Sequence, residues 1–92
     1  MKYQLIFTES YNKRAKRFLK IHPELILLYQ KALELLELNP HHPSLRLHRL
    51  QGKLKYLHSV SINIKYRITF EFIIQKRSIL LINVGSHADV YS

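Results

Sequence analysis

Titratable and polar side chains gather near the end of the chain, where Gly85-Ser86-His87-Ala88-Asp89-Val90-Tyr91 follows a nearly continuous apolar run from Ile79 to Val84. A loop held by a buried strand is a common position for functional residues. Imidazole titrates near neutral pH, so His87 could act as a general acid or a general base at cytoplasmic pH. The alternatives are that His87 is an ordinary surface residue and that Tyr91 anchors the tail by packing.

Arg67 is a second candidate, because it lies on an alternating run from Tyr66 to Phe72. One face of this run carries Tyr66, Ile68, Phe70 and Phe72, and the other carries Arg67, Thr69 and Glu71. A period of two with aromatic and β-branched residues predicts a half-buried strand. Its polar face is free to do chemistry or to bind a ligand, unless Arg67 only pairs with Glu71 on the same face.

The charge balance predicts a polyanionic partner. Lys and Arg number 15 against 6 for Asp and Glu, a net charge of +9 on 92 residues. Such an excess favours nucleic acid or an acidic protein. One basic cluster lies in a run without any acid, where Tyr56, His48 and His58 add rings on which a base could stack: Arg46, Arg49, Lys53, Lys55, Lys65 and Arg67. A second cluster, expected to be a solvated helix face, is Lys13, Arg14, Lys16, Arg17 and Lys20.

Several kinds of site are excluded. Without cysteine there is no disulfide, no thiol nucleophile and no Cys-based zinc site. No apolar run approaches the roughly 18 residues of a membrane span, and Met1 to Phe7 lacks the apolar core of a secretory signal. We therefore expect a soluble, cytoplasmic protein. His41 and His42 are adjacent, but neighbouring loop side chains diverge and no third ligand follows at a fixed spacing, so we predict no metal and no other cofactor.

The N-terminal half is expected to cover the apolar face of the strand from Tyr66 to Phe72. Lys2 to Phe7 alternates as a short strand, and Thr8 to Ser10 is a helix-start signal. Apolar residues then recur at helical spacing at Tyr11, Ala15, Phe18 and Leu19. His22-Pro23 breaks this helix and begins a second that runs to about Leu38, so the two should form an antiparallel hairpin.

The C-terminal half predicts three consecutive antiparallel strands, Tyr56 to Ile62, Tyr66 to Phe72 and Ile79 to Gly85. The middle one should be central, and the third, being continuously apolar, should lie inside the sheet. Residues 1–92 are thus expected to form a single α+β domain. Its sheet would be four-stranded and antiparallel, with the helical hairpin on one face.

The order of these elements, the Leu50-Gln51-Gly52-Lys53-Leu54-Lys55 turn, the strand from Lys65 to Phe70 and the C-terminal motif together resemble the RelE/ParE superfamily of type II toxins. The ending Gly-x-His-x-x-x-aromatic most resembles the YafQ-like branch of ribosome-dependent mRNA endonucleases. The resemblance covers essentially the whole chain. It implies as partners a cognate acidic antitoxin, the ribosome and mRNA, and a toxin that is monomeric or bound to its antitoxin in a hetero-oligomer.

The resemblance also implies roles for residues in metal-independent attack of a 2′-hydroxyl on the scissile phosphate. His87 would be the general acid, and His48 the general base or a substrate-positioning group. Arg67, with Lys53 or Lys55, would stabilise the phosphate, and Tyr91 would stack on or orient the nucleotide. The implied RNA and phosphate contacts are Arg46, Arg49, Lys53, Lys55, Tyr56, His58 and Lys65.

The chain departs from the YafQ-like pattern at two positions, Ser61 and Lys65, where relatives carry His and Asp. Either His58 takes over, or the site works with Arg and Lys as in other RelE-like toxins. Strand parity disfavours the first option, because His58 should face the same side as Val60 and Ile62. Two other functions stay open: a ParE-like inhibitor of DNA gyrase, which would not need His87 and Tyr91, and a degenerate relative that only binds antitoxin or RNA.

Overall fold

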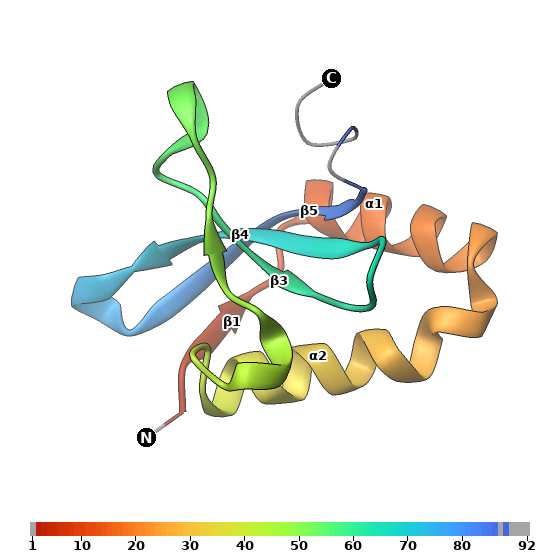
Figure 1. Cartoon of the computed structure of the whole chain (residues 1–92), viewed down its shortest axis with the longest axis horizontal. Helices are drawn as coiled ribbons and strands as arrows, with labels where there is room; N and C mark the ends of the chain where they lie inside the picture. The colour runs from red at the N-terminus through yellow and green to blue at the C-terminus, as the bar shows by residue number, and fades with distance from the viewer. Residues whose placement is uncertain (1, 87, 89–92) are drawn as a thin grey trace.

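Five strands form one sheet in the order β1-β5-β4-β3-β2. The computed structural model describes residues 2–86 and 88. In chain order, the strands and helices shown in Figure 1 are β1 (Gln4–Ile6), α1 (Glu9–Ile21), α2 (Ile26–Leu38), β2 (His48–Arg49), β3 (His58–Ser61), β4 (Arg67–Ile73) and β5 (Ser78–Gly85). The predicted α+β class, helical hairpin and central position of β4 are confirmed.

The predicted four-stranded antiparallel sheet is wrong in both respects. β2 is a fifth strand, two residues long and antiparallel to β3. β1 runs parallel to β5, where Gln4 pairs with Ser78 and Ile6 with Leu80. The sequence could not show either feature. A two-residue strand is too short to display a period, and an alternating pattern identifies a strand without identifying its neighbour.

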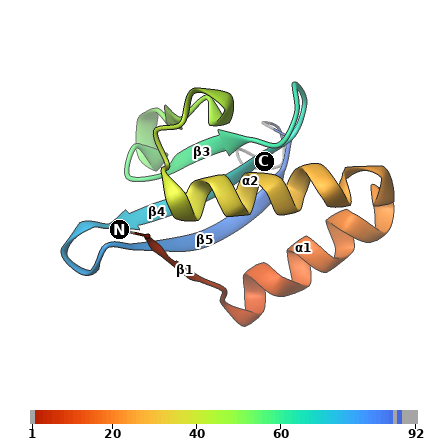
Figure 2. The same cartoon turned by 90° about the horizontal axis from the view of Figure 1, so that it is seen from below.

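The two helices pack side by side on one face of the sheet, as Figure 2 shows from that side. Thr8 caps α1, because its hydroxyl accepts a hydrogen bond from the backbone N–H of Tyr11 at 3.0 Å. Pro23 opens a short 3₁₀ turn, Pro23–Leu25, that separates the helices. Deep between them the hydroxyls of Tyr11 and Tyr29 lie 2.7 Å apart, so each buried phenol has a hydrogen-bond partner.

The core lies between this helix layer and β4. Ile68 and Phe70 of β4 are fully buried, together with Val60 of β3 and Ile79 and Leu81 of β5. The alternation predicted for β4 is thereby confirmed on its apolar side. β5 contains one extra residue opposite Thr69 and Phe70, whose partners are Asn83 and Leu81, a β-bulge that locally bends the strand. In the described part of the chain, no helix combines the length and apolarity needed to span a membrane.

Candidate nucleic-acid interface

Strand register brings His48 and Arg67 to the same side of the sheet. His48 of β2 pairs with Ser59 of β3, and Ser59 pairs with Thr69 of β4. Side chains of directly paired residues share a face, and so do residues two apart on one strand. His48, Ser59, Arg67 and Thr69 therefore share a side of the sheet that we call the outer sheet face, on which Ser59 and Thr69 are themselves buried. It lies opposite the helices, because Ile68 and Phe70 point into the core.

Arg67 is fixed on this face by three hydrogen bonds. Its Nε donates to the hydroxyl of Ser59 at 2.7 Å, and its Nη2 donates to the carbonyls of Ser59 at 3.0 Å and Arg46 at 2.5 Å. Within the described residues the two N–H groups of Nη1 have no hydrogen-bond partner, so a phosphate oxygen could accept hydrogen bonds from them. No ion pair joins Arg67 to Glu71, although the structure describes both side chains.

The environment of Arg67 lowers the pKa of its guanidinium below the ordinary value, first through burial and then through the charge of Arg46. A guanidinium nevertheless keeps its charge at neutral pH. The arrangement therefore presents a positioned cation at the surface. Each Nη1 N–H group can donate a hydrogen bond to an oxygen of a bound anion such as phosphate.

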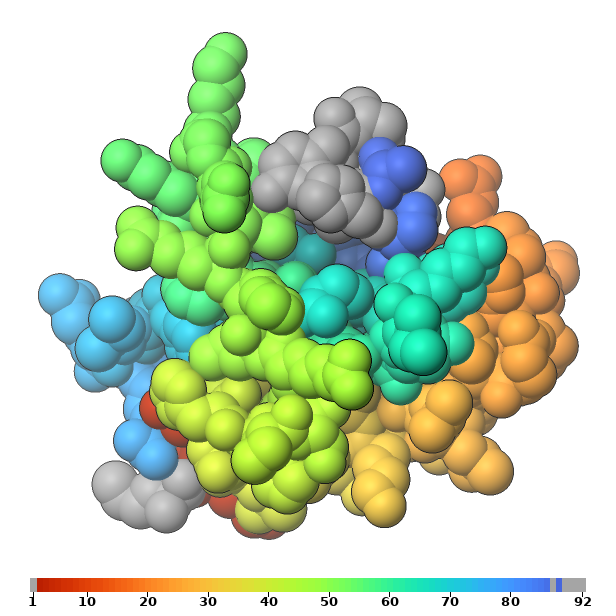
Figure 3. Space-filling model, viewed as in Figure 1, coloured from red at the N-terminus to blue at the C-terminus, as the bar shows by residue number. Residues whose placement is uncertain are grey.

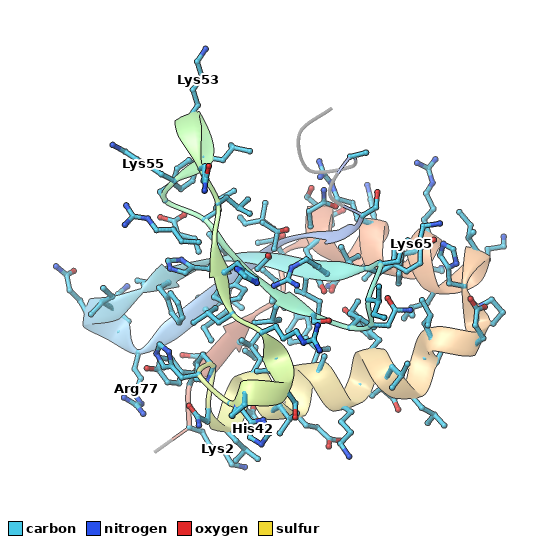
Figure 4. The ribbon with its side chains drawn as sticks, viewed as in Figure 1. Lys2, His42, Lys53, Lys55, Lys65 and Arg77 are labelled. Carbon is cyan, nitrogen blue, oxygen red and sulfur yellow. The ribbon has the colours of Figure 1, made fainter. Side chains whose placement is uncertain are left out.

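The segment from Arg46 to Tyr56, which contains β2, projects from the rest of the domain. Arg46 has a left-handed backbone with φ of 48°, and Gly52 has φ of 68°. The Nε of Arg49 donates to the carbonyl of Lys55 at 2.8 Å, which closes the segment on itself. At its tip Lys53 and Lys55 point away from the protein in Figure 4. Lys53 and Lys55 are therefore available to a partner that extends beyond the edge of the sheet to this tip.

Tyr56, which is 56% exposed, lies at the end of this segment. Its ring is accessible enough for a base to stack on it. The exposed ring suits the predicted contact of Tyr56 with RNA, which stays a prediction.

His58 lies on the side of the sheet that Val60 shares, as strand parity predicted, and the pairing of β3 with β4 puts Arg67 on the other side. Its ring centroid is 4.9 Å from that of Phe72 and 6.1 Å from that of Phe70, both on the helix side. Its Nδ1 is buried and has no hydrogen-bond partner among the residues that the structure describes. Burial, then the charge of Arg49, then His41 lower the pKa of His58, so the ring is held in its neutral form. His58 and Arg67 therefore do not share one site.

Lys65 lies apart from the other members of its sequence cluster. It follows a turn in which the side-chain oxygen of Asn63 accepts hydrogen bonds from the backbone N–H groups of Lys65 at 3.0 Å and Tyr66 at 2.8 Å. Figure 4 shows Lys65 at the far end of the sheet from Lys53 and Lys55. Ser61, on the same turn, donates its hydroxyl to the carbonyl of Asn63 at 2.7 Å.

His87 and Tyr91, the predicted acid and stacking group, lie outside the described residues. Among the predicted residues that are described, the structure brings together His48, Arg46 and Arg67. It places His58 on the opposite face, and Lys65 far from Lys53 and Lys55. Sequence reasoning missed Ser59, which anchors Arg67. The alternation of β3 places Ser59 opposite His58, but only the register of β3 with β4 shows that it meets Arg67.

No protein-family model and no curated protein matches the sequence. Solved structures do match it. YafQ from E. coli strain BL21(DE3) superposes with a TM-score of 0.80 at 15% identity, covering 98% of this chain and 99% of that one.

A chain of the E. coli DinJ-YafQ toxin-antitoxin complex matches with a TM-score of 0.78 at 15% identity over 100% of both chains. A YoeB/ParE toxin from Agrobacterium tumefaciens matches with a TM-score of 0.74 at 13% identity, over 91% of this chain and 98% of that one. At these identities the likeness establishes a shared fold that extends over nearly the whole chain.

Proposed function

We propose that this chain is the toxin of a type II toxin-antitoxin system, of the YafQ-like branch of the RelE/ParE superfamily, and that it cleaves mRNA on the ribosome. The observation that carries the proposal is the fold shared with YafQ over 98% of this chain. Support comes from the basic composition and from the outer sheet face, where Arg67 is held with two N–H groups directed to no described partner.

The proposed reaction moves two protons. A base removes the proton of a ribose 2′-hydroxyl, the oxygen forms a bond to the adjacent phosphorus, the bond from phosphorus to the 5′ oxygen breaks, and an acid protonates that oxygen. His48, exposed on the outer sheet face, is the candidate base. Arg67 would stabilise the charge that develops on the phosphate. His87 would be the acid, an assignment that rests on the resemblance of the C-terminal motif.

An acidic antitoxin is the proposed protein partner. The DinJ-YafQ structure is that of a toxin-antitoxin complex, and the net charge of +9 on this chain favours a partner of opposite sign. Lys53, Lys55 and Arg67 would then be contacts that the antitoxin neutralises. The proposal places the protein in the cytoplasm, where ribosomes and mRNA are found.

The test is to map mRNA ends by primer extension in a reconstituted translation reaction. Wild-type protein should cut the message only while ribosomes translate it. His48→Ala and His87→Ala should each reduce cutting by 10²-fold or more, because general acid-base catalysis contributes roughly 10²–10⁴-fold. His41→Ala is the matched control, because His41 is exposed on a loop and its ring packs near Phe72 on the helix side. It should leave cutting unchanged.

The other outcomes separate the alternatives. If folded wild-type protein leaves translated mRNA intact, the nuclease is refuted, and a DNA gyrase supercoiling assay then tests the ParE-like alternative. If cutting survives His87→Ala, the reaction class stands and the acid is a different group. Cutting of free mRNA as fast as translated mRNA would contradict the role of the ribosome.

A further inference from the structure

A hollow of about 880 Å³ lies between α1 and the end of the sheet, and neither His48 nor Arg67 lines it. β1 is three residues long and pairs only with Ser78–Leu80, so the second half of β5 extends beyond it alongside α1. Figure 3 shows the atoms of the β3–β4 turn meeting those of α1 at this place. We call it the α1 cleft; it is lined by Lys13, Arg14, Arg17, Phe18, Ile21, His22, Lys65, Tyr66, Asn83, Val84 and Ser86.

Four cationic side chains line the α1 cleft, and no carboxylate among the described residues does. Lys13, Arg14 and Arg17 lie three and four residues apart and so project from one side of the helix. Lys13 lies 3.8 Å from Glu9, a fully solvated pair that holds it weakly. In the described part of the chain, Arg14 and Arg17 make no ion pair. The cleft is therefore a concentration of positive charge that no carboxylate among the described residues neutralises.

Aromatic rings lie among these cations. The ring centroid of Tyr66 is 5.1 Å from that of Phe18 and 4.7 Å from that of His22, and the Nζ of Lys65 lies 5.4 Å from the Tyr66 centroid. The Asn63 turn fixes the backbone of both Lys65 and Tyr66. Positive charge combined with aromatic rings in one groove is the combination with which proteins hold single-stranded nucleic acid. A base can stack on the partly exposed ring of Tyr66, whereas the charge of an acidic peptide would engage the cations alone.

We propose that the α1 cleft binds single-stranded RNA, with backbone phosphates on Arg14, Arg17 and Lys65 and a base beside Tyr66. Asn83 lines the cleft and pairs in register with Thr69 of the outer sheet face. The cleft thus borders β5 beside β4, the strand that carries Arg67. The inference concerns binding alone and stands whether or not the protein cleaves RNA.

The test is the salt dependence of RNA binding, measured by fluorescence anisotropy. The probe is a labelled single strand of about 12 nucleotides with 2′-O-methyl groups on every ribose, which prevents attack by a 2′-hydroxyl. Arg14→Gln/Arg17→Gln is compared with Lys16→Gln/Lys20→Gln, which removes the same charge from the same helix at exposed positions outside the cleft. Each phosphate contact on a single strand contributes about 0.7 to the slope of log K against log salt.

Loss of two contacts should reduce the slope by about 1.4, which corresponds to about 25-fold weaker binding at 0.1 M salt when the curves are extrapolated to meet at 1 M. The control pair should change affinity by less than about threefold, as expected for distant, screened charges. Equal losses in the two variants would overturn the proposal, because the effect would then be one of net charge. Polyglutamate that binds at the cleft while RNA does not would also overturn it and identify a protein-binding surface.

An independent measurement uses the unaltered protein. Titration with the same RNA should shift the backbone amide signals of Lys65, Tyr66 and Arg17 in a ¹H–¹⁵N correlation spectrum. If these signals do not shift while the RNA binds, the proposal that the α1 cleft is the binding site is refuted, even if the double variant binds weakly. A thermal unfolding curve for each variant shows whether a loss of binding reflects a loss of folded protein.

Discussion

Arg67 should stabilise the fold as well as serve the proposed reaction, and Arg67→Ala is expected to lower the free energy of unfolding by about 3 kcal/mol. The substitution removes the bonds of Nε and Nη2 to Ser59, whose side chain is 3% exposed. A buried polar group that loses its partner costs about 1–3 kcal/mol, and a hydrogen bond to a charged group contributes about 1.5–3 kcal/mol. The Arg46 carbonyl is at the surface, where water can replace the arginine.

Urea unfolding followed by circular dichroism measures this loss. With an m-value of about 1.5 kcal/mol per molar, a loss of about 3 kcal/mol lowers the midpoint by about 2 M. Ser59→Ala and the double variant complete a cycle, in which residues in contact typically couple by about 0.5–3 kcal/mol. We expect a coupling of at least about 1 kcal/mol, because most of the loss is assigned to the Ser59 hydroxyl.

Glu71→Ala is the control for the alternative ion pair. Since no bond joins Arg67 to Glu71, their effects should add to within about 0.5 kcal/mol. Strong coupling to Glu71 with additivity at Ser59 would refute the reasoning. The result also affects the cleavage assay, because a loss of activity in Arg67→Ala has meaning only per folded molecule.

Three further predictions concern buried or strained groups. Burial raises the pKa of Tyr11 and Tyr29, so the unfolded chain loses its phenolic protons at a lower pH than the folded protein. The free energy of unfolding should therefore fall above about pH 10, by up to about 1.4 kcal/mol per pH unit for each tyrosine. Tyr11→Phe should cost about 1–2 kcal/mol near neutral pH, because it leaves the Tyr29 hydroxyl unpaired, and an unchanged urea midpoint would contradict this. Burial, then Arg49 and His41, lower the pKa of His58, so the unfolded chain takes up this proton at a higher pH than the folded protein. The free energy of unfolding should therefore fall as the pH drops from about 6.5 through the folded-state pKa. His58→Phe should reduce that fall in unfolding curves recorded across this pH range. Gly52 has φ of 68° and nothing within 4 Å of an added Cβ, so Gly52→Ala should cost about 1 kcal/mol of backbone strain alone, and a cost above about 2 kcal/mol would indicate contacts that the structure does not show.

Local chemistry made the helical hairpin predictable. Thr8 offers a hydroxyl for the cap and Pro23 interrupts the helix, and each signal acts within a few residues of itself. The alternation in β4 was predictable for the same reason, and it correctly places Ile68 in the core. What could not be predicted is pairing. That β1 lies beside β5 depends on contacts between residues more than 70 positions apart, which no local period encodes.

The candidate site shows the same division. Strand parity placed His58 on the side of Val60, and the packing of its ring near Phe72 confirms it. The hydrogen bonds from Arg67 to Ser59 depend on the register between β3 and β4, so the sequence could not predict them. The cations of α1 were predicted to be a solvated face, because a helical pattern shows which side chains point away from its own core. It does not show that Lys65 returns to the same side and encloses a cleft with Arg17.

Closeness in sequence was therefore a poor guide to which cations act together. The acid-free run from Arg46 to Arg67 is one cluster in the sequence, but the fold distributes it over three surfaces: the outer sheet face, the tip that carries Lys53 and Lys55, and the α1 cleft with Lys65. Charges at physiological salt are screened over about 8 Å, whereas the molecule measures 35 × 29 × 27 Å. Surfaces at opposite ends of the sheet thus act on different phosphates. A net charge of +9 arranged in this way suits a large, extended polyanion better than a single bound nucleotide.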